Sequence, residues 1–236
     1  PKERFSNQQW QRKLRQRRCT ECITIERVAQ LTAPECWICL GEEVDKQEHL
    51  RRDCLCQGTN AGFVHLLCLV EYAKKKNQEC DDRDQDDLDL AGVTGPWEVC
   101  PNCKQDYQNT LSIDMANEFV SFVEGQHPND KHKHVEALVL KLGSLSQIDE
   151  AKEVATRILV LIGQMKVETP MLPTRCMKME AFTYNDLGAV ALSEGKEESA
   201  KEALIHFEKC LELSTAIDFA VGISDAEYNI ALAKST

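Results

Sequence analysis

The chain has 236 residues and a formal net charge of −11. This length fits one large domain or two small ones, and the acidic balance argues against a protein whose whole surface binds nucleic acid. No apolar run approaches the roughly 18 residues that a bilayer span needs, and no secretory signal is visible. We therefore expect an intracellular protein, cytoplasmic or nuclear, without a transmembrane segment.

The cysteines are distributed unevenly along the chain. Ten of the 12 fall between Cys19 and Cys103. In an intracellular chain such a concentration favours metal ligands over disulfides. The change in composition also predicts two parts, a cysteine-rich region over residues 31–110 and an α-helical region over residues 111–236.

Residues 1–30 are predicted to form a basic, helical N-terminal arm. Seven basic residues lie within the first 18, against one acid, Glu3. A solvated arm, a nucleic-acid contact and a nuclear-targeting signal all fit this pattern. Cys19 and Cys22 are interpreted either as structural cysteines or as half of a further metal site. Because the chain begins with Pro1, we expect a fragment or a processed form.

The cysteine-rich region carries its candidate ligands in four short pairs. Each pair is close enough in sequence for one tight turn to bring both side chains to the same ion. Eight ligands of thiolate and imidazole type predict two tetrahedral zinc sites and exclude magnesium and calcium. A disulfide framework does not require this pairing, and a thioredoxin-like centre needs a βαβ context that is absent. The pairs are Cys36 with Cys39, Cys54 with Cys56, His65 with Cys68, and Cys100 with Cys103.

Other residues of this region lie outside the four ligand pairs. The acidic stretch 79–95, rich in aspartate, is predicted to be a solvated, mobile loop. Cys80 has no paired neighbour and is interpreted as a free thiol. His49 could replace a cysteine ligand, although it lies outside any short pair. Trp97 is predicted to pack in the core.

The ligand order is four cysteines, one histidine and three cysteines, with only Leu55 between the third and fourth ligands. With the segments CWIC, CLCQG, FVHLLCL and CPNCKQDY, this order resembles the RING-CH variant of RING zinc domains. A PHD finger shares the order but usually has a longer spacer at Leu55. Two spacings exceed those usual in the family, from Cys56 to His65 and from Cys68 to Cys100. A longer flexible loop costs little closure entropy.

The resemblance implies a small α+β domain in which two zinc ions are held in a cross-brace. Four protein ligands would close each site, which suits a structural role. No nucleophile–base pair, phosphate loop or cofactor motif appears elsewhere, so any activity would come from bringing other proteins together. The resemblance assigns the first zinc to Cys36, Cys39, His65 and Cys68, and the second to Cys54, Cys56, Cys100 and Cys103.

The resemblance also implies RING-type E3 ubiquitin ligase activity. The partners would be ubiquitin and a ubiquitin-conjugating enzyme, whose thioester the domain orients for attack. Ile38, Tyr72 and Pro101 match the positions that contact the conjugating enzyme in similar domains, and Lys104 matches the cation that can link the enzyme to ubiquitin. Arginine is usual there in the strongest cases, and lysine lacks its planar fork of donors. Core packing, turn formation and ordinary surface are the alternative roles of these four residues.

From Leu111 onward the pattern changes to amphipathic helix. Residues 126–134 interrupt it with Pro128 and three histidines, His127, His132 and His134, and are predicted to be a solvated connector. Apolar side chains gather at helical spacing on one face of the helix before this connector. They are Ile113, Ala116, Phe119, Val120 and Val123.

The helices after the connector are predicted to form antiparallel pairs, 134–147 with 148–165 and 179–195 with 199–216. The second pair resembles the tetratricopeptide repeat, in which small residues allow close helix packing and large ones fill the space between. About three extra residues follow its turn, compared with that repeat. A third unit, 224–236, stops after one helix. The residues that carry the resemblance are Leu187, Gly188, Gly195, Ala203, Phe207 and Cys210.

Cys176 and Cys210 lie in this helical region and are interpreted as helix-packing residues. The leading hypothesis for the whole chain is a ubiquitin ligase whose helical repeats recruit an unknown protein substrate or mediate self-association. The alternative is a non-catalytic zinc-finger adaptor or a PHD-like reader. A nucleic-acid-binding protein that uses the basic arm ranks last, and no membrane partner is expected.

Overall fold

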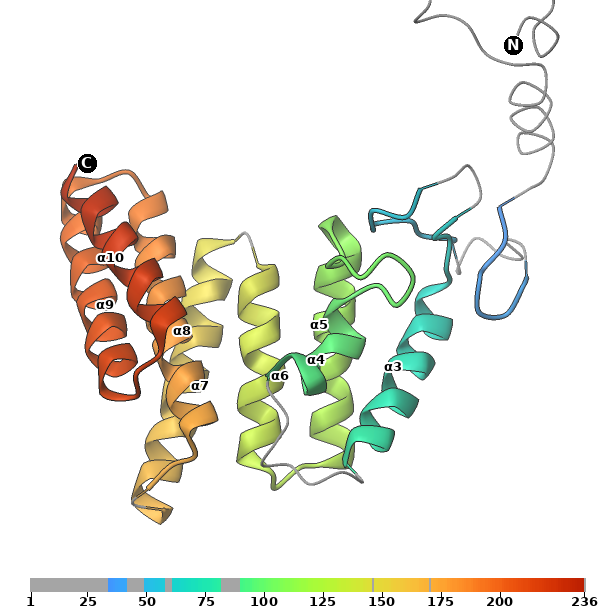
Figure 1. Ribbon diagram of the computed structural model, residues 1–236, viewed down its shortest axis with the longest axis horizontal. Helices are drawn as coiled ribbons and strands as arrows, with labels where there is room; N and C mark the ends of the chain where they lie inside the picture. The colour runs from blue at the N-terminus through green and yellow to red at the C-terminus, as the bar shows by residue number, and fades with distance from the viewer. Residues whose placement is uncertain are drawn as a thin grey trace, which may run out of the picture.

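The computed structural model describes residues 34–41, 49–57, 61–81, 90–145, 147–169 and 171–235. The predictions for the basic arm, including Cys19 and Cys22, therefore lie outside the described residues, as does the side chain of Cys80. The described helices follow one another along an elongated array (Figure 1). They are α3 (Leu66–Asp81), α4 (Leu90–Glu98), α5 (Asn109–Gln126), α6 (Lys131–Ser144), α7 (Ile148–Glu168), α8 (Thr174–Ser193), α9 (Glu197–Ala216) and α10 (Ala220–Lys234).

The cysteine-rich region is more helical than its sequence suggested. The acidic stretch 79–95 is helical at both ends, because α3 continues to Asp81 and α4 begins at Leu90. The prediction of a loop over the whole stretch is therefore wrong at these ends, while residues 82–89 lie outside the described part. α4 packs against α3, α5 and α6 and buries Thr94 and Trp97. Packing of α4 on these three helices explains why the stretch is not a loop at this end.

One apolar core joins the cysteine-rich region to the first helices of the helical region, with members from Cys36 to Ala137. Trp97, only 1% exposed, stacks on Phe119 with the ring centroids 4.9 Å apart. Its indole Nε1 donates a hydrogen bond to Asn77 Oδ1 at 3.3 Å, so this buried donor is paired. The prediction that Trp97 packs in the core is confirmed.

Three of the five residues predicted to form the apolar face of α5 are buried. Ile113 and Val120, which the pattern assigned to this face, are only half-buried. α5 contacts three neighbouring helices, α3, α4 and α6, so it buries a wider sector than a single face. The buried side chains of α5 are Leu111, Met115, Ala116, Phe119, Phe122 and Val123.

From α5 to α10 each helix packs against the next one in the chain, and Figure 1 shows α10 at the end of the array opposite α3. Helices α8 and α9 pack closely against each other, as the small residues of this pair predicted. A Cβ placed on Gly188 would lie 2.4 Å from Phe207 Cε1, so only glycine lets the two helices approach this closely around the ring. The predicted helix pairs are confirmed; their assignment to the tetratricopeptide repeat stays a prediction.

The two cysteines of the helical region are buried among packed helices. Cys176 and Cys210 are each 1% exposed, and each belongs to an apolar cluster. Burial raises the pKa of the Cys176 thiol to about 11, which keeps it protonated near neutral pH. Their prediction as helix-packing residues is confirmed.

The predicted connector over 126–134 is shorter in the structure. α6 begins at Lys131, because the Asp130 side chain accepts a hydrogen bond from the Lys133 backbone N–H at 3.1 Å and caps the helix. Two of the histidines make polar contacts: His132 Nδ1 lies 3.0 Å from Cys176 Sγ although the residue is exposed, and His134 Nε2 lies 3.1 Å from a backbone carbonyl oxygen. Among the described helices, none combines the length and apolar character of a membrane span.

Candidate metal centre

The first group of metal-ligand side chains joins a turn near the start of the described chain to the beginning of α3. The ligand atoms of Cys36, Cys39, His65 and Cys68 all lie within 4.8 Å of one another. His65 Nδ1 lies 3.4 Å from Cys39 Sγ and 3.8 Å from Cys68 Sγ. A tetrahedral zinc with bonds of 2.0–2.3 Å needs donors about 3.5–3.8 Å apart. These two distances are close to the edge of a zinc tetrahedron, and the other donor pairs lie within 4.8 Å.

The second group joins the loop before α3 to the turn after α4. The ligand atoms of Cys54, Cys56, Cys100 and Cys103 also lie within 4.8 Å of one another, and Cys56 Sγ is 3.8 Å from Cys100 Sγ. This distance again matches the edge of a tetrahedron with zinc–sulfur bonds of about 2.3 Å. The two groups interleave along the sequence, since the second uses residues on both sides of His65 and Cys68.

The two groups can hold two zinc ions, and the prediction of this cofactor is confirmed. One group offers three thiolates and an imidazole, the other four thiolates, and both sets suit zinc. Within the described part of the chain, no third set of three or more such side chains gathers in this way. His49, the possible substitute ligand, is described but belongs to neither group.

The same backbone turn occurs once in each group. In both turns the first cysteine carbonyl accepts a hydrogen bond from the N–H four residues later, Leu40 at 2.7 Å and Lys104 at 2.9 Å. Leu40 and Lys104 have φ values of 57° and 58°, the left-handed region that bends the chain back. The sequences CWICLG and CPNCKQ thus adopt one conformation that points two thiols at one point.

The electrostatics of the groups show why a cation belongs there. Burial, together with the neighbouring thiols Cys39 and Cys36, raises the pKa of the Cys68 thiol. For Cys36, burial alone would raise the pKa, but hydrogen bonds from the backbone N–H groups of Cys39, His65 and Ile38 outweigh it and lower the pKa to about 7. A divalent ion relieves the repulsion among crowded thiolates, so metal binding and thiol deprotonation are coupled.

Gly62 packs against two ligands of the second group, a role that was not predicted from the sequence. Its φ of 82° is unfavourable for residues with a side chain. A Cβ at this position would lie 2.7 Å from Cys56 Cβ and 3.0 Å from Cys54 Sγ. A glycine three residues before the ligand His65, in a segment with no predicted helix or strand, was the sequence feature that could have indicated this role. Glycine here lets the backbone pass directly over two ligands.

The four residues predicted to contact partners come from three segments that the metal groups hold. Ile38 and Pro101 lie inside the two ligand turns and are half-buried, and Lys104 is exposed just after the second turn. Tyr72 lies on the first turns of α3, also half-buried, and its ring meets the edge of Trp37 with the centroids 5.9 Å apart. This contact connects the first ligand turn to α3. A role for these residues in partner binding stays a prediction.

Three exposed leucines surround the metal groups, and sequence reasoning did not select them. Leu40, Leu55 and Leu67 are 73%, 54% and 56% exposed. Each stands next to a ligand in the sequence, beside Cys39, between Cys54 and Cys56, and between His65 and Cys68. Adjacency to a ligand does not by itself predict exposure, because Leu66, which also lies between His65 and Cys68, is half-buried and packs against the core.

Polar contacts tie the metal groups to the start of α5. Arg51 forms an ion pair with Asp114. The backbone N–H of Gln108 donates to the Asp53 carbonyl at 2.8 Å, and the Asn109 side-chain amide donates to Asp53 Oδ1 at 3.3 Å. The loop that carries Cys54 and Cys56 is therefore anchored to the helical array and not only to its ligands.

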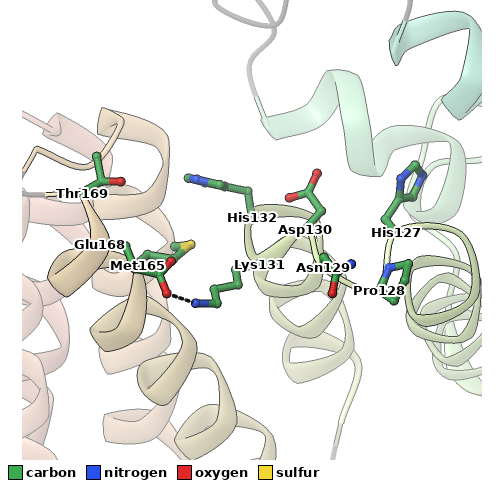
Figure 2. A pocket seen from close by; sticks show the side chains of 9 residues that line it. All are labelled: His127, Pro128, Asn129, Asp130, Lys131, His132, Met165, Glu168 and Thr169. Carbon is green, nitrogen blue, oxygen red and sulfur yellow. Dashed lines mark hydrogen bonds and ion pairs between the residues drawn. The ribbon is translucent and has the colours of Figure 1, made fainter.

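A separate cleft of about 630 Å³ lies between the start of α6 and the end of α7. Figure 2 shows that the Lys131–Glu168 ion pair crosses between its two walls. Asp130, on the same rim, already caps α6. These three charged side chains are thus engaged in local structure, and none of the eight ligands lines the cleft.

The comparison with protein families agrees with this geometry. Residues 36–82 match the RING-variant domain family. This segment is a RING-variant zinc-finger domain, and it contains six of the eight ligands. The match ends before Cys100 and Cys103, which the fold nevertheless brings to Cys54 and Cys56. No curated protein and no solved structure matches the chain.

Proposed function

We propose that the chain is a RING-type E3 ubiquitin ligase of the RING-CH kind. The observation that carries this proposal is the set of eight ligands in two interleaved groups, six of them within the RING-variant match. RING-variant domains are generally associated with ubiquitin ligases, and their usual partner is a ubiquitin-conjugating enzyme. With zinc bound, the interleaved groups would form a cross-brace that keeps the two ligand turns and α3 in fixed relative positions.

The zinc ions would act in this function as structural supports. Four protein donors fill the coordination sphere of a tetrahedral zinc, so neither group offers a place for substrate or water. The contribution to ubiquitin transfer is orientation: a bound conjugating enzyme and its ubiquitin thioester are restricted to geometries in which a substrate lysine can attack. No side chain of this chain forms a covalent intermediate in that scheme.

The docking surface for the conjugating enzyme would combine Ile38, Tyr72 and Pro101 with the exposed Leu40 and Leu67. Exposed leucines beside rigid ligand turns present apolar area without further loss of backbone freedom, which favours binding. Lys104, at the corresponding turn of the second group, would donate to ubiquitin and the conjugating enzyme together. A lysine offers a single flexible ammonium group at this position, so we expect weaker activation than an arginine would give.

The helical array would recruit the protein that receives ubiquitin. Stacked helix pairs offer an extended surface suited to peptides or helices, and the continuous core between Cys36 and Ala137 supports a fixed distance between bound substrate and the zinc domain. Assignment of α6 to α10 to tetratricopeptide-like repeats belongs to this proposal.

The test is autoubiquitination of the full chain with a panel of conjugating enzymes. We expect ubiquitin chains with the native protein and at least about a tenfold loss for Ile38→Ala, since interface hot spots often contribute 2 kcal/mol or more. Ile205→Ala, which removes an aliphatic side chain 67% exposed on α9, is the matched control and should keep full activity. Zinc content and melting temperature establish that the variants are folded.

Absence of activity in the native chain, with two zinc ions bound and an intact fold, would contradict the proposal and favour a non-catalytic adaptor. The reader alternative needs aromatic faces open to a methylated lysine. Trp37 and Tyr72, the aromatic pair beside the first metal group, meet edge to face at 72°. Binding of a methylated-lysine peptide by the native chain, with no ubiquitin transfer, would favour the reader.

A further inference from the structure

A cavity of about 270 Å³ lies where the zinc domain meets the helical array. One wall comes from α4 and from the chain just after the second ligand turn, and the other from α5 and α6. Trp97, Val139 and Leu140 give the cavity apolar surface. Among the described residues that line it, none is a lysine, an arginine or a histidine. The charge of the cavity is therefore decided by its acidic side chains.

Glu98 and Asp106 contribute two carboxylates to the first wall. The chain on either side of the second ligand turn holds them together: Val99 and Asp106 form an antiparallel bridge, and the Tyr107 backbone N–H donates to the Glu98 carbonyl oxygen at 2.8 Å. Burial raises the pKa of Glu98, the Thr94 hydroxyl opposes this rise, and the nearby Asp106 adds to it. Neither carboxylate forms an ion pair with a side chain in the described part of the chain.

The hydroxyl groups of the cavity use their protons locally. Thr94 Oγ1 donates to Glu98 at 3.2 Å. Ser112 Oγ and Ser144 Oγ each donate to a backbone carbonyl oxygen of their own helix, at 2.9 Å and 2.8 Å. All three oxygens can still accept a hydrogen bond, as can the buried Tyr107 hydroxyl, which has no partner among the described residues. The cavity thus offers acceptors and favours a ligand group with several donors.

An ammonium or guanidinium group on an aliphatic stem has this chemistry. It carries several N–H donors and no acceptor, and its charge matches the two carboxylates. Its methylene groups can pack on Trp97, Val139 and Leu140. At about 270 Å³ the cavity is smaller than the roughly 300–1,000 Å³ of sites that hold drug-sized ligands. It therefore suits one side chain better than a whole cofactor.

We propose that this cavity binds the side chain of a lysine or an arginine from a protein partner, with the charged end at Glu98 and Asp106. A segment anchored there touches the zinc domain and α6 together, because both line the cavity. Gly143 belongs to the α6 wall, and a Cβ at this position would have nothing within 4 Å. This inference does not depend on ubiquitin transfer.

Titration of the full, zinc-loaded chain with N-acetyl-lysine methylamide, and separately with its arginine counterpart, tests the binding. The NMR signal of the Trp97 indole N–H reports on the cavity wall. We expect a saturable shift, and the norleucine counterpart, which has the stem without the charge, should bind about tenfold more weakly. Absence of a shift with both cations, or equal affinity for lysine and norleucine, overturns the proposal. Equal affinity for n-butylamine, which has no peptide backbone, overturns the assignment to a protein partner.

Two changes to the cavity locate the binding. Glu98→Gln combined with Asp106→Asn removes both charges at nearly constant shape and should weaken lysine binding about tenfold. Gly143→Met fills the cavity from the α6 wall and should abolish binding. Gly163→Met on α7, where a Cβ would likewise meet nothing within 4 Å, is the matched control and should bind like the native chain. Native affinity in either cavity variant, with two zinc ions bound and unchanged circular dichroism, overturns the proposal.

Discussion

The zinc domain and the helices from α8 to α10 are stabilised in different ways. Around the metal groups, turns and loops converge on eight donor atoms, and exposed leucines stand beside the ligands. Around α8 and α9, close side-chain packing stabilises the fold, since Gly188 leaves room for the Phe207 ring. Coordination chemistry can therefore be read from residue type and spacing, whereas packing depends on which helices meet. Perturbing each region separately tests whether their stabilities depend on different interactions and how far the two regions are coupled.

Chelation of zinc has the largest expected effect. Each structural zinc contributes on the order of 10 kcal/mol of folding free energy, so its removal should unfold the two ligand turns, α3 and α4. Because the core from Cys36 to Ala137 is continuous, α5 should lose stability as well, while α8 to α10 should remain folded. Hydrogen exchange with and without a chelator measures this gradient. Equal loss of protection in α9 and in α3 would show that the chain is one cooperative unit.

Gly62→Ala should disable the second metal group selectively. The added Cβ would overlap Cys56 and approach Cys54, so we expect bound zinc to fall from two ions per chain to one. Elemental analysis of the purified variant measures this ratio. Gly125→Ala is a suitable control, because nothing lies within 4 Å of a Cβ at that helical position. Two zinc ions bound by Gly62→Ala would contradict the role assigned to this glycine.

Phe207→Ala should damage the other region and leave the first intact. The ring is fully buried, and its removal leaves a cavity, for which about 3–5 kcal/mol of the free energy of unfolding is lost. Denaturant unfolding followed by circular dichroism measures the loss, and zinc content should remain at two. Glu208→Ala, an exposed neighbour on α9, should change stability little. A fall in zinc content would show a coupling that the structure does not predict.

The connection between the regions should respond least to mutation. Arg51 and Asp114 pair across it while both side chains remain about one-third exposed. Such pairs contribute about 0–1 kcal/mol, so Arg51→Ala should lower the free energy of unfolding by no more than this. A double-mutant cycle with Asp114→Ala isolates the pairwise energy. A coupling energy well above that range would make this pair, and not the shared apolar core, the main link.

Several features could be predicted from the sequence because they depend on local chemistry. The eight ligands follow from residue type and short spacing, and the buried Trp97 and Cys210 follow from apolar character. The helical ends of the acidic stretch could not be predicted in this way. Its aspartates favour solvent locally, but α4 gains burial for Thr94 and Trp97 only after distant helices have packed around it.

The donors of two zinc sites follow from residue type and spacing alone, since ligand identity and reach are properties of neighbouring residues. The paired helices of the second part of the chain follow in the same way, because apolar periodicity is a property of one segment. The exposure of Leu40, Leu55 and Leu67, and the need for glycine at position 62, became clear only from the folded structure. Exposure is a relation between segments far apart in the chain, and no single segment carries it.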